Sequence, residues 1–217
     1  MVASIFRVPW TRGGLYDRMQ RAWARFVVAA AGGEVTVTGA EHLAAGTPQI
    51  VAANHASFID ILALLGHLPL DPKFISKKEI FAIPILGRAM HAAGHVAMDR
   101  GHQKQAFGAY ARASAEMREK GLTIVVYPEG TRTRTGELLP FKKGAFVFAI
   151  ESGAPIVPCW IEGAFLIQPK GTWIVRPRPM RITLGRPISP AGYTLDQRAE
   201  LAERVRAAML ALRPHGD

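Results

Sequence analysis

Short runs of Val, Ile and Ala recur along this chain between longer stretches with helical spacing of apolar residues. Runs of this kind, bounded by Gly, Pro and charged residues, are typical of buried strands. The expected strands cover residues 35–38, 48–54, 73–76, 95–98, 122–127, 154–161 and 180–184. Because they alternate with helical segments, they predict a single α/β domain with a mixed, largely parallel sheet flanked by helices. The segment 122–127 is the most hydrophobic, so we expect it at the centre of the sheet.

The helical segments have start and stop signals. Ser57 precedes Asp60 with the spacing of a capping box, which predicts a helix that begins at Ser57. Thr194 and Gln197 repeat that spacing before the last helix. Between them we expect one helix over 80–93 and another over 102–120, ended by Gly94 and Gly121.

A further helix is expected at residues 15–30, ahead of the first strand. At 100° per residue its apolar positions share one face, and three arginines cluster on a flank of the opposite side. The apolar positions are Leu15, Met19, Trp23, Phe26 and Ala30, and the arginines are Arg18, Arg21 and Arg25. Such a helix either lies in a membrane interface or covers the domain core. We interpret residues 1–33 as a membrane-associating amphipathic segment that precedes the α/β domain, residues 34–217.

Composition narrows the classes of partner. The single cysteine, Cys159, cannot form an internal disulfide, and no run of 18 apolar residues predicts a conventional membrane span. The formal net charge of +10 predicts an anionic partner: nucleic acid, an anionic bilayer or a phosphorylated substrate. Nucleic acid is the weaker of these, because the arginines gather at one loop and one helix and do not line an aromatic groove.

The stretch 54–60 carries the first candidate chemistry. His55 follows a buried strand, and Asp60 lies in the first turn of the next helix, from where its carboxylate can accept a hydrogen bond from one imidazole nitrogen. The other nitrogen is then left as a base, with no protein nucleophile beside it. The alternative is a structural cap at the helix start with a bystander histidine.

The loop 128–144 after the central strand carries the second candidate site. Gly130 allows close approach of the backbone to an oxyanion, and Arg132 can hold a phosphate through two hydrogen bonds. The alternative is a solvated basic turn. No metal motif such as HExxH or paired cysteines is present. Together the two stretches favour deprotonation of a hydroxyl on a phosphate-bearing substrate, which then attacks an acyl donor.

Four blocks in this order resemble the glycerolipid acyltransferase family, in particular bacterial 1-acyl-glycerol-3-phosphate acyltransferases. The blocks are Asn54-His-Ala-Ser-Phe-Ile-Asp60, Lys77-Lys-Glu-Ile-Phe-Ala-Ile-Pro-Ile-Leu-Gly87 with Met98-Asp-Arg100, Tyr127-Pro-Glu-Gly-Thr-Arg132 with Phe141-Lys-Lys-Gly144, and Ala154-Pro-Ile-Val-Pro158. The resemblance covers residues 35–190. It departs at the N-terminus, where many relatives have clear membrane spans and this chain has only the amphipathic helix.

The resemblance implies transfer of a fatty acyl group from acyl-CoA or acyl-carrier protein to the 2-hydroxyl of the lysophospholipid 1-acyl-glycerol-3-phosphate, which yields phosphatidic acid. His55 would be the general base and Asp60 would orient it. The glycerol-phosphate site would contain Glu129, Gly130, Thr131 and Arg132, with Lys78 and Arg100 as weaker candidates.

The implied transfer is direct, with no cofactor, no metal and no covalent enzyme intermediate. Backbone N–H groups at the Ser57 helix start are candidate oxyanion donors. We expect an anionic membrane surface as a partner, no nucleic acid, and a peripheral or monotopic location on the cytoplasmic face of the membrane. Two alternatives remain open: an acyltransferase for another lysophospholipid or for glycerol-3-phosphate, and a non-catalytic basic membrane-binding protein.

Overall fold

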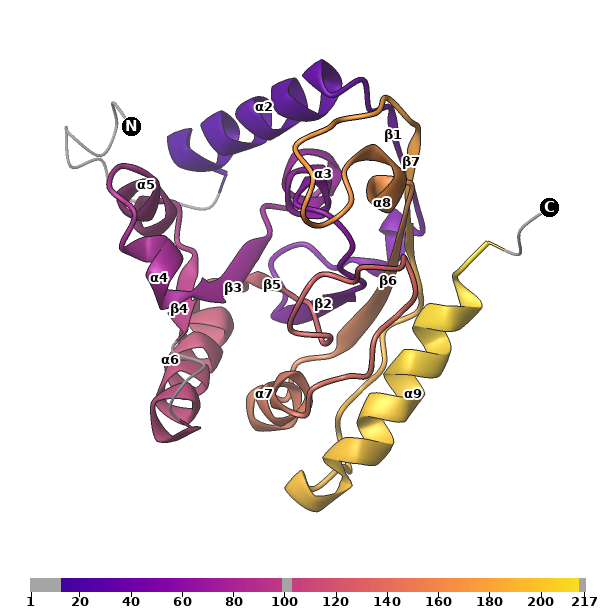
Figure 1. The fold of residues 1–217 in the computed structure, drawn as a ribbon. Helices are drawn as coiled ribbons and strands as arrows, with labels where there is room; N and C mark the ends of the chain where they lie inside the picture. Colours follow the sequence, from indigo (N-terminus) through magenta and orange to yellow (C-terminus); the bar gives the residue numbers. More distant parts are fainter. Residues whose placement is uncertain (1–12, 99–102, 215–217) are drawn as a thin grey trace.

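The computed structural model describes residues 13–98 and 103–214 (Figure 1). Among these residues, seven strands form one sheet in the order β1-β7-β6-β2-β5-β3-β4. The strands are β1 Val35–Thr38, β2 Gln49–Ala53, β3 Lys73–Lys77, β4 Val96–Met98, β5 Thr123–Val126, β6 Ile156–Glu162 and β7 Met180–Leu184. The helices are α2 Leu15–Ala30, α3 Ile59–His67, α4 Lys78–Phe81, α5 Leu86–Ala92, α6 Gln103–Lys120, α7 Gly144–Ser152, α8 Ala164–Ile167 and α9 Arg198–Ala211, with 3₁₀ turns η1 Ala40–His42 and η2 Leu195–Gln197. The predicted α/β class with a mixed, largely parallel sheet is confirmed.

The centre of the sheet is parallel. Val51 of β2 lies between Val125 of β5 and Val157 of β6, and both neighbours run in the same direction as β2. The only antiparallel pair among the described strands joins β6 to β7. The carboxyl ends of β2, β5 and β6 therefore meet at one edge, where open α/β sheets bind their ligands.

Successive side chains of a strand point to opposite faces of the sheet, so each central strand contributes to two separate hydrophobic cores. Val51 and Val125 face a core covered by α2, α3 and α8, whereas Ile50 and Ile124 face a core covered by α6, α7 and α9. Figure 1 shows these two layers of helices on opposite sides of the sheet. All five residues of β2 are buried, which explains its continuous apolar run.

Helix α2 turns its predicted apolar stripe outward. Phe26 is 71% exposed and Trp23 52%, and Leu15 and Met19 are also exposed. The buried face of the helix consists instead of Tyr16, Asp17, Ala24 and Val28. The interpretation that this stripe covers the domain core is therefore wrong.

The arginines of α2 bind the end of α3. Arg25 donates a hydrogen bond from Nε to the carbonyl oxygen of Gly66 at 2.7 Å, and Arg21 donates to the carbonyl oxygens of Leu68 and Leu70. Gly66 lies in the last turn of α3, and Leu68 and Leu70 follow it, at the end of the helix where the dipole favours a cation. Arg21 and Arg25 therefore bind the domain on the side opposite the apolar stripe, and Arg18 is exposed.

A buried polar network fixes α2 against the edge of the sheet. Lys73 of β3 donates a hydrogen bond from Nζ to Asp17 Oδ1 at 2.5 Å, and both side chains are fully buried. Burial lowers the pKa of Lys73, and the hydrogen bond to Asp17 opposes that shift. His95 lies nearby: burial lowers its pKa to about 3, so it is neutral, with Nδ1 accepting from the Phe74 N–H and Nε2 bound to Gln20.

Several expected boundaries are corrected. Helix α3 begins at Ile59, two residues after Ser57. The expected helix over 80–93 is broken into α4 and α5, because Pro84 interrupts the hydrogen-bond ladder and Ile85 adopts a φ of +70°. Helix α7 was not expected from the sequence. The capping box of Thr194 and Gln197 is present, but it opens the 3₁₀ turn η2 ahead of α9.

Candidate active site

The site lies at the carboxyl edge of the sheet, where β2 and β6 separate. Asn54 directly follows β2, and its side chain bonds the backbone of β6. Its Nδ2 donates to the carbonyl oxygen of Ile161 at 2.9 Å, and its Oδ1 accepts from the N–H of the same residue at 2.6 Å. The main chain is thereby released from the sheet, and His55 leaves the edge of the sheet in the following turn.

His55 and Asp60 make the predicted contact. Nδ1 of the imidazole lies 3.0 Å from Asp60 Oδ2. Asp60 is fully buried, whereas the imidazole side chain is 14% exposed. A carboxylate accepts only, so Nδ1 carries the proton and Nε2 is left as the acceptor. The pair can therefore take a proton from a substrate that reaches Nε2.

Asp60 also closes the turn at the start of α3. The same oxygen, Oδ2, accepts the N–H groups of Ala56 at 2.7 Å and Ser57 at 2.8 Å. Ser57 Oγ accepts the N–H of Ile59 at 3.2 Å. These three N–H groups are already donated within the turn, so the suggestion that backbone N–H groups at this helix start form the oxyanion hole is wrong for them.

Tyr127, at the end of β5, stacks on the imidazole. The two ring centroids lie 4.0 Å apart with an interplanar angle of 17°. The phenol hydroxyl is buried and has no hydrogen-bond partner among the described residues, and burial raises the pKa of Tyr127 well above its ordinary value. The sequence analysis assigned no role to Tyr127, although it is the first residue of the Tyr127–Arg132 block.

Glu129 joins the two predicted stretches. Its carboxylate accepts the backbone N–H of His55 at 2.6 Å through Oε1 and the N–H of Leu139 at 2.8 Å through Oε2. The N–H of Thr133 in turn donates to the carbonyl oxygen of His55 at 2.9 Å. Burial is the largest cause that raises the pKa of Glu129 to about 7, and the two backbone hydrogen bonds oppose it. The candidate phosphate loop is therefore bound directly to the histidine turn.

In the rest of the loop Thr131 is exposed and Arg132 is half-buried. Gly130 completes a turn with its N–H on the carbonyl oxygen of Tyr127, and its φ of +69° favours glycine. Within the described part of the chain the half-buried Arg132 guanidinium has no hydrogen bond and no ion pair. Lys170, which the sequence analysis missed, donates from Nζ to Thr131 Oγ1 at 2.9 Å and to the Arg132 carbonyl oxygen at 3.3 Å.

Lys78 and Arg100 are the two weaker candidates for the phosphate site. Lys78 is exposed and opens α4 directly after β3, so its backbone lies near the same edge of the sheet as His55. Arg100 lies outside the described residues. Across the described ranges, no group of three or more His, Cys, Asp or Glu side chains is placed to hold a metal ion.

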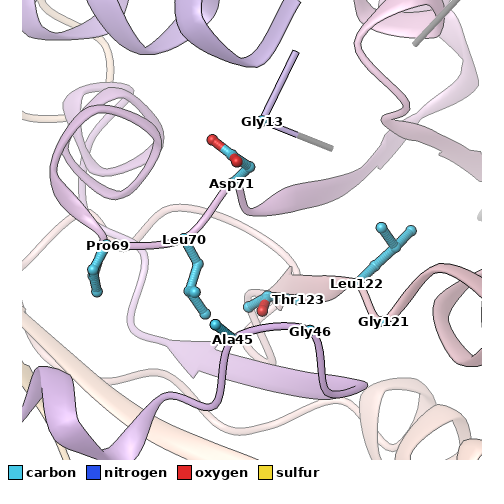
Figure 2. A pocket seen from close by; sticks show the side chains of 9 residues that line it. All are labelled: Gly13, Ala45, Gly46, Pro69, Leu70, Asp71, Gly121, Leu122 and Thr123. Atoms are coloured by element: carbon cyan, nitrogen blue, oxygen red, sulfur yellow. The ribbon is translucent and has the colours of Figure 1, made fainter. Parts of the chain in front are cut away.

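A cavity of about 300 Å³ lies at the opposite edge of the sheet (Figure 2). It opens where the loop after α3 passes the amino ends of β2 and β5. Its lining residues are Gly13, Ala45, Gly46, Pro69, Leu70, Asp71, Gly121, Leu122 and Thr123. The sheet separates this cavity from His55, so it is no part of the candidate active site.

Comparison with known families tests the resemblance noted in the sequence. The sequence model of the Acyltransferase family matches residues 34–162, which include His55, Asp60 and the loop up to Arg132. The chain belongs to the Acyltransferase family. This match covers more than half of the chain and ends with β6, so the family core is the part of the sheet that carries the site.

Two proteins similar to this acyltransferase-family chain are named for the same activity. The 1-acyl-sn-glycerol-3-phosphate acyltransferase of Limnanthes douglasii is 36% identical over 75% of this chain and 57% of its own length. That of Cocos nucifera is 31% identical over 92% of this chain and 65% of its own length. The chain thus spans less than two thirds of these relatives.

A solved structure extends the comparison to three dimensions. The crystal structure of the 1-acyl-sn-glycerophosphate (LPA) acyltransferase from Thermotoga maritima matches with a TM-score of 0.73 and 27% sequence identity. The match covers 92% of this chain and 81% of that chain. The similarity therefore includes elements on both sides of the family core.

The buried carboxylate of Glu129 generates a prediction about stability. Its pKa is raised from 4.5 to about 7 in the folded protein, so between these pH values the folded state keeps a proton that the unfolded state releases. The free energy of unfolding should therefore fall as pH rises through this window, by up to about 3 kcal/mol from this group. Glu129→Gln should make the melting temperature less dependent on pH between 4.5 and 7.

The matched control is Glu151→Gln, which neutralises an exposed carboxylate on α7. Thermal unfolding followed by circular dichroism across the pH range measures both variants. A pH dependence as steep in Glu129→Gln as in the unmodified protein would contradict the raised pKa.

Proposed function

We propose that this protein transfers a fatty acyl group from acyl-CoA or acyl-carrier protein to the 2-hydroxyl of 1-acyl-glycerol-3-phosphate, which yields phosphatidic acid. The observation that carries the proposal is the junction of His55 with the loop that contains Arg132. The His55 N–H donates to the Glu129 carboxylate at 2.6 Å, and the Thr133 N–H donates to the His55 carbonyl oxygen at 2.9 Å. A base and a cationic anion site are thereby held within reach of one substrate molecule. The names of the similar proteins supply the acceptor.

The first chemical step is proton removal. Nε2 of His55 accepts the proton of the substrate 2-hydroxyl while the oxygen attacks the thioester carbonyl carbon, and a tetrahedral oxyanion forms. Collapse of this intermediate breaks the C–S bond. The imidazolium then returns its proton to the thiolate, so no acyl group is ever attached to the protein.

Asp60 and Tyr127 support the base during this cycle. The Asp60 carboxylate at 3.0 Å from Nδ1 fixes the tautomer and stabilises the imidazolium that forms. The Tyr127 ring, stacked at 4.0 Å, limits rotation of the imidazole and presents its π face to the developing positive charge. Both act on His55 and not on the substrate, so they are positioning residues.

The phosphate of the acceptor is assigned to Thr131 and Arg132 and to the turn at Gly130. The Arg132 guanidinium, which has no partner among the described residues, is suited to two parallel hydrogen bonds with a phosphate. Lys170, bound to Thr131, adds a second positive charge at the same place. Glu129 stays in the proposed site as the residue that holds the loop, because both of its oxygens accept backbone N–H groups.

We also propose that the protein binds the cytoplasmic face of an anionic membrane. None of the helices in the described ranges has both the length and the hydrophobicity needed to cross a bilayer. The outward stripe of α2, which contains Trp23 at 52% and Phe26 at 71% exposure, fits partial burial in the interface. Both lipids of the proposed reaction are membrane components, so contact with the bilayer gives access to them.

The His55→Ala variant tests the base. Positioned general-base catalysis contributes about 10²- to 10⁴-fold, so kcat with labelled acyl-CoA and lysophosphatidic acid should fall by at least that factor. The matched control is His42→Ala, in a 3₁₀ turn beyond the first strand, which should retain turnover. Near-normal turnover in a folded His55→Ala protein would refute the assignment.

The Arg132→Ala variant tests the phosphate site. Loss of a charge-assisted bidentate contact should raise KM for the lysophospholipid by about 10- to 100-fold, with a smaller effect on kcat. Arg132→Lys should give an intermediate KM, because lysine keeps the charge without the fork. Arg134→Ala, an exposed arginine two residues away, should have a smaller effect than Arg132→Ala. An unchanged KM and kcat in Arg132→Ala would reject the phosphate role.

The Phe26→Ser variant tests the outward face of α2. Loss of one large apolar side chain from the bilayer interface should lower the partition coefficient on anionic phospholipid vesicles by about tenfold. Leu210→Ser, on α9 on the other side of the sheet, is the control, because Leu210 is 38% exposed. Equal sedimentation of Phe26→Ser and the unmodified protein at low salt would show that this face is not the membrane contact.

A further inference from the structure

The loop between α8 and β7 exposes its apolar residues at the tip. Trp173 is 95% exposed, Ile174 59% and Val175 41%. Three consecutive large apolar side chains in solvent are unfavourable for a protein surface unless something covers them. Trp173 is the most exposed of the large apolar side chains in the described residues.

The base of this loop is well ordered by hydrogen bonds. The N–H of Arg176 donates to the carbonyl oxygen of Ile167 at 2.9 Å, and the N–H of Thr172 donates to that of Pro169 at 3.3 Å. A third bond, from the N–H of Ile174 to Thr172 Oγ1 at 3.0 Å, shapes the tip. The tip is therefore presented by a closed loop and does not result from an unstructured chain.

The loop lies beside the end of α2. A Cβ added at Gly32, just past this helix, would lie 2.5 Å from Pro177 Cβ, and one at Gly33 would lie 3.7 Å from Ile167 Cδ1. Figure 1 shows the loop, in orange, on the same side of the sheet as α2 and α3. The loop and the end of α2 are thus neighbouring segments on the same side of the sheet.

The charge of the segment is strongly positive. Between Glu162 and Asp196 the sequence has no acidic residue and five cations, which equals half of the net charge of +10. The cations are Lys170, Arg176, Arg178, Arg181 and Arg186. A tryptophan flanked by arginines is the composition that favours an anionic bilayer interface, where the ring lies at headgroup depth.

We infer that the loop of residues 171–178 is a second membrane contact, which inserts Trp173 into the interface of an anionic bilayer. This inference extends the proposed membrane association, which rests there on α2 alone. Lys170 at the base of the loop binds Thr131 and the Arg132 carbonyl oxygen. Insertion of the tip would therefore bring the proposed phosphate loop close to the level at which the phosphate of a membrane-bound lysophospholipid lies.

An acidic protein is the competing partner, since acyl-carrier protein could bind the same cations. The apolar tip favours the bilayer, because a partner recognised by charge alone gives no reason to expose Trp173, Ile174 and Val175 together. Binding measurements with vesicles and with acyl-carrier protein distinguish the two partners.

The test uses the full chain and vesicles of phosphatidylglycerol and phosphatidylcholine, without an acyl donor. Trp173→Ser should lower the partition coefficient by about tenfold or more, the factor expected for one large apolar side chain. Trp173→Phe should retain most of the binding. Arg176→Gln with Arg178→Gln should weaken binding to anionic vesicles and leave binding to phosphatidylcholine alone unchanged.

Leu210→Ser is the matched control for loss of an exposed apolar side chain. Thermal unfolding should be unchanged in Trp173→Ser, because an almost fully exposed ring contributes little to the fold. Unchanged partitioning of Trp173→Ser on vesicles would overturn the inference. If the same variant also lost binding of acyl-carrier protein, the loop would be a contact for that protein and not for the bilayer. Since vesicle binding needs no catalysis, an inactive protein that still binds through Trp173 would overturn the proposed function alone.

Discussion

One carboxylate oxygen organises the reactive end of this molecule. Asp60 Oδ2 accepts three hydrogen bonds, from the imidazole Nδ1 of His55 and from the backbone N–H groups of Ala56 and Ser57. An ionised carboxylate with no exposed surface is costly unless donors surround it. The turn between β2 and α3 supplies them, and the start of α3 adds a favourable dipole. The orientation of the imidazole therefore follows from the same bonds that close the turn.

A second buried carboxylate, on Glu129, performs the corresponding task between segments that are distant in sequence. It accepts one N–H from the histidine turn and one from Leu139, farther along the loop. The charge of Asp60 contributes to the raised pKa of Glu129, though less than burial does. One carboxyl group orients the proposed base, and the other fixes the position of the loop that contains Arg132. In this arrangement the Glu129 side chain, together with the bond from the Thr133 N–H to the His55 carbonyl oxygen, fixes the loop against the histidine turn.

Sequence reasoning succeeded where the relevant contacts are local. The strands at 35–38 and 180–184, the helix at 15–30 and the contact of His55 with Asp60 depend on spacing within a few residues, and spacing can be read directly. Contacts across the sheet depend on strand order and register, which no local pattern specifies. The stack of Tyr127 on His55 and the bond of Lys170 to Thr131 are of that kind, so both were missed.

Helix α2 shows the same limit in another form. Its periodicity separates an apolar face from a basic one, but periodicity does not tell which face the domain buries. The backbone carbonyl groups at the end of α3 need hydrogen-bond donors, and Arg21 and Arg25 supply them. The basic flank of α2 therefore faces the domain. With the arginines engaged inward and Asp17 bound to Lys73, Trp23 and Phe26 have only the outer side available. The helix is fixed by these polar bonds together with the burial of Ala24 and Val28, and an apolar environment outside would stabilise its exposed aromatic side chains.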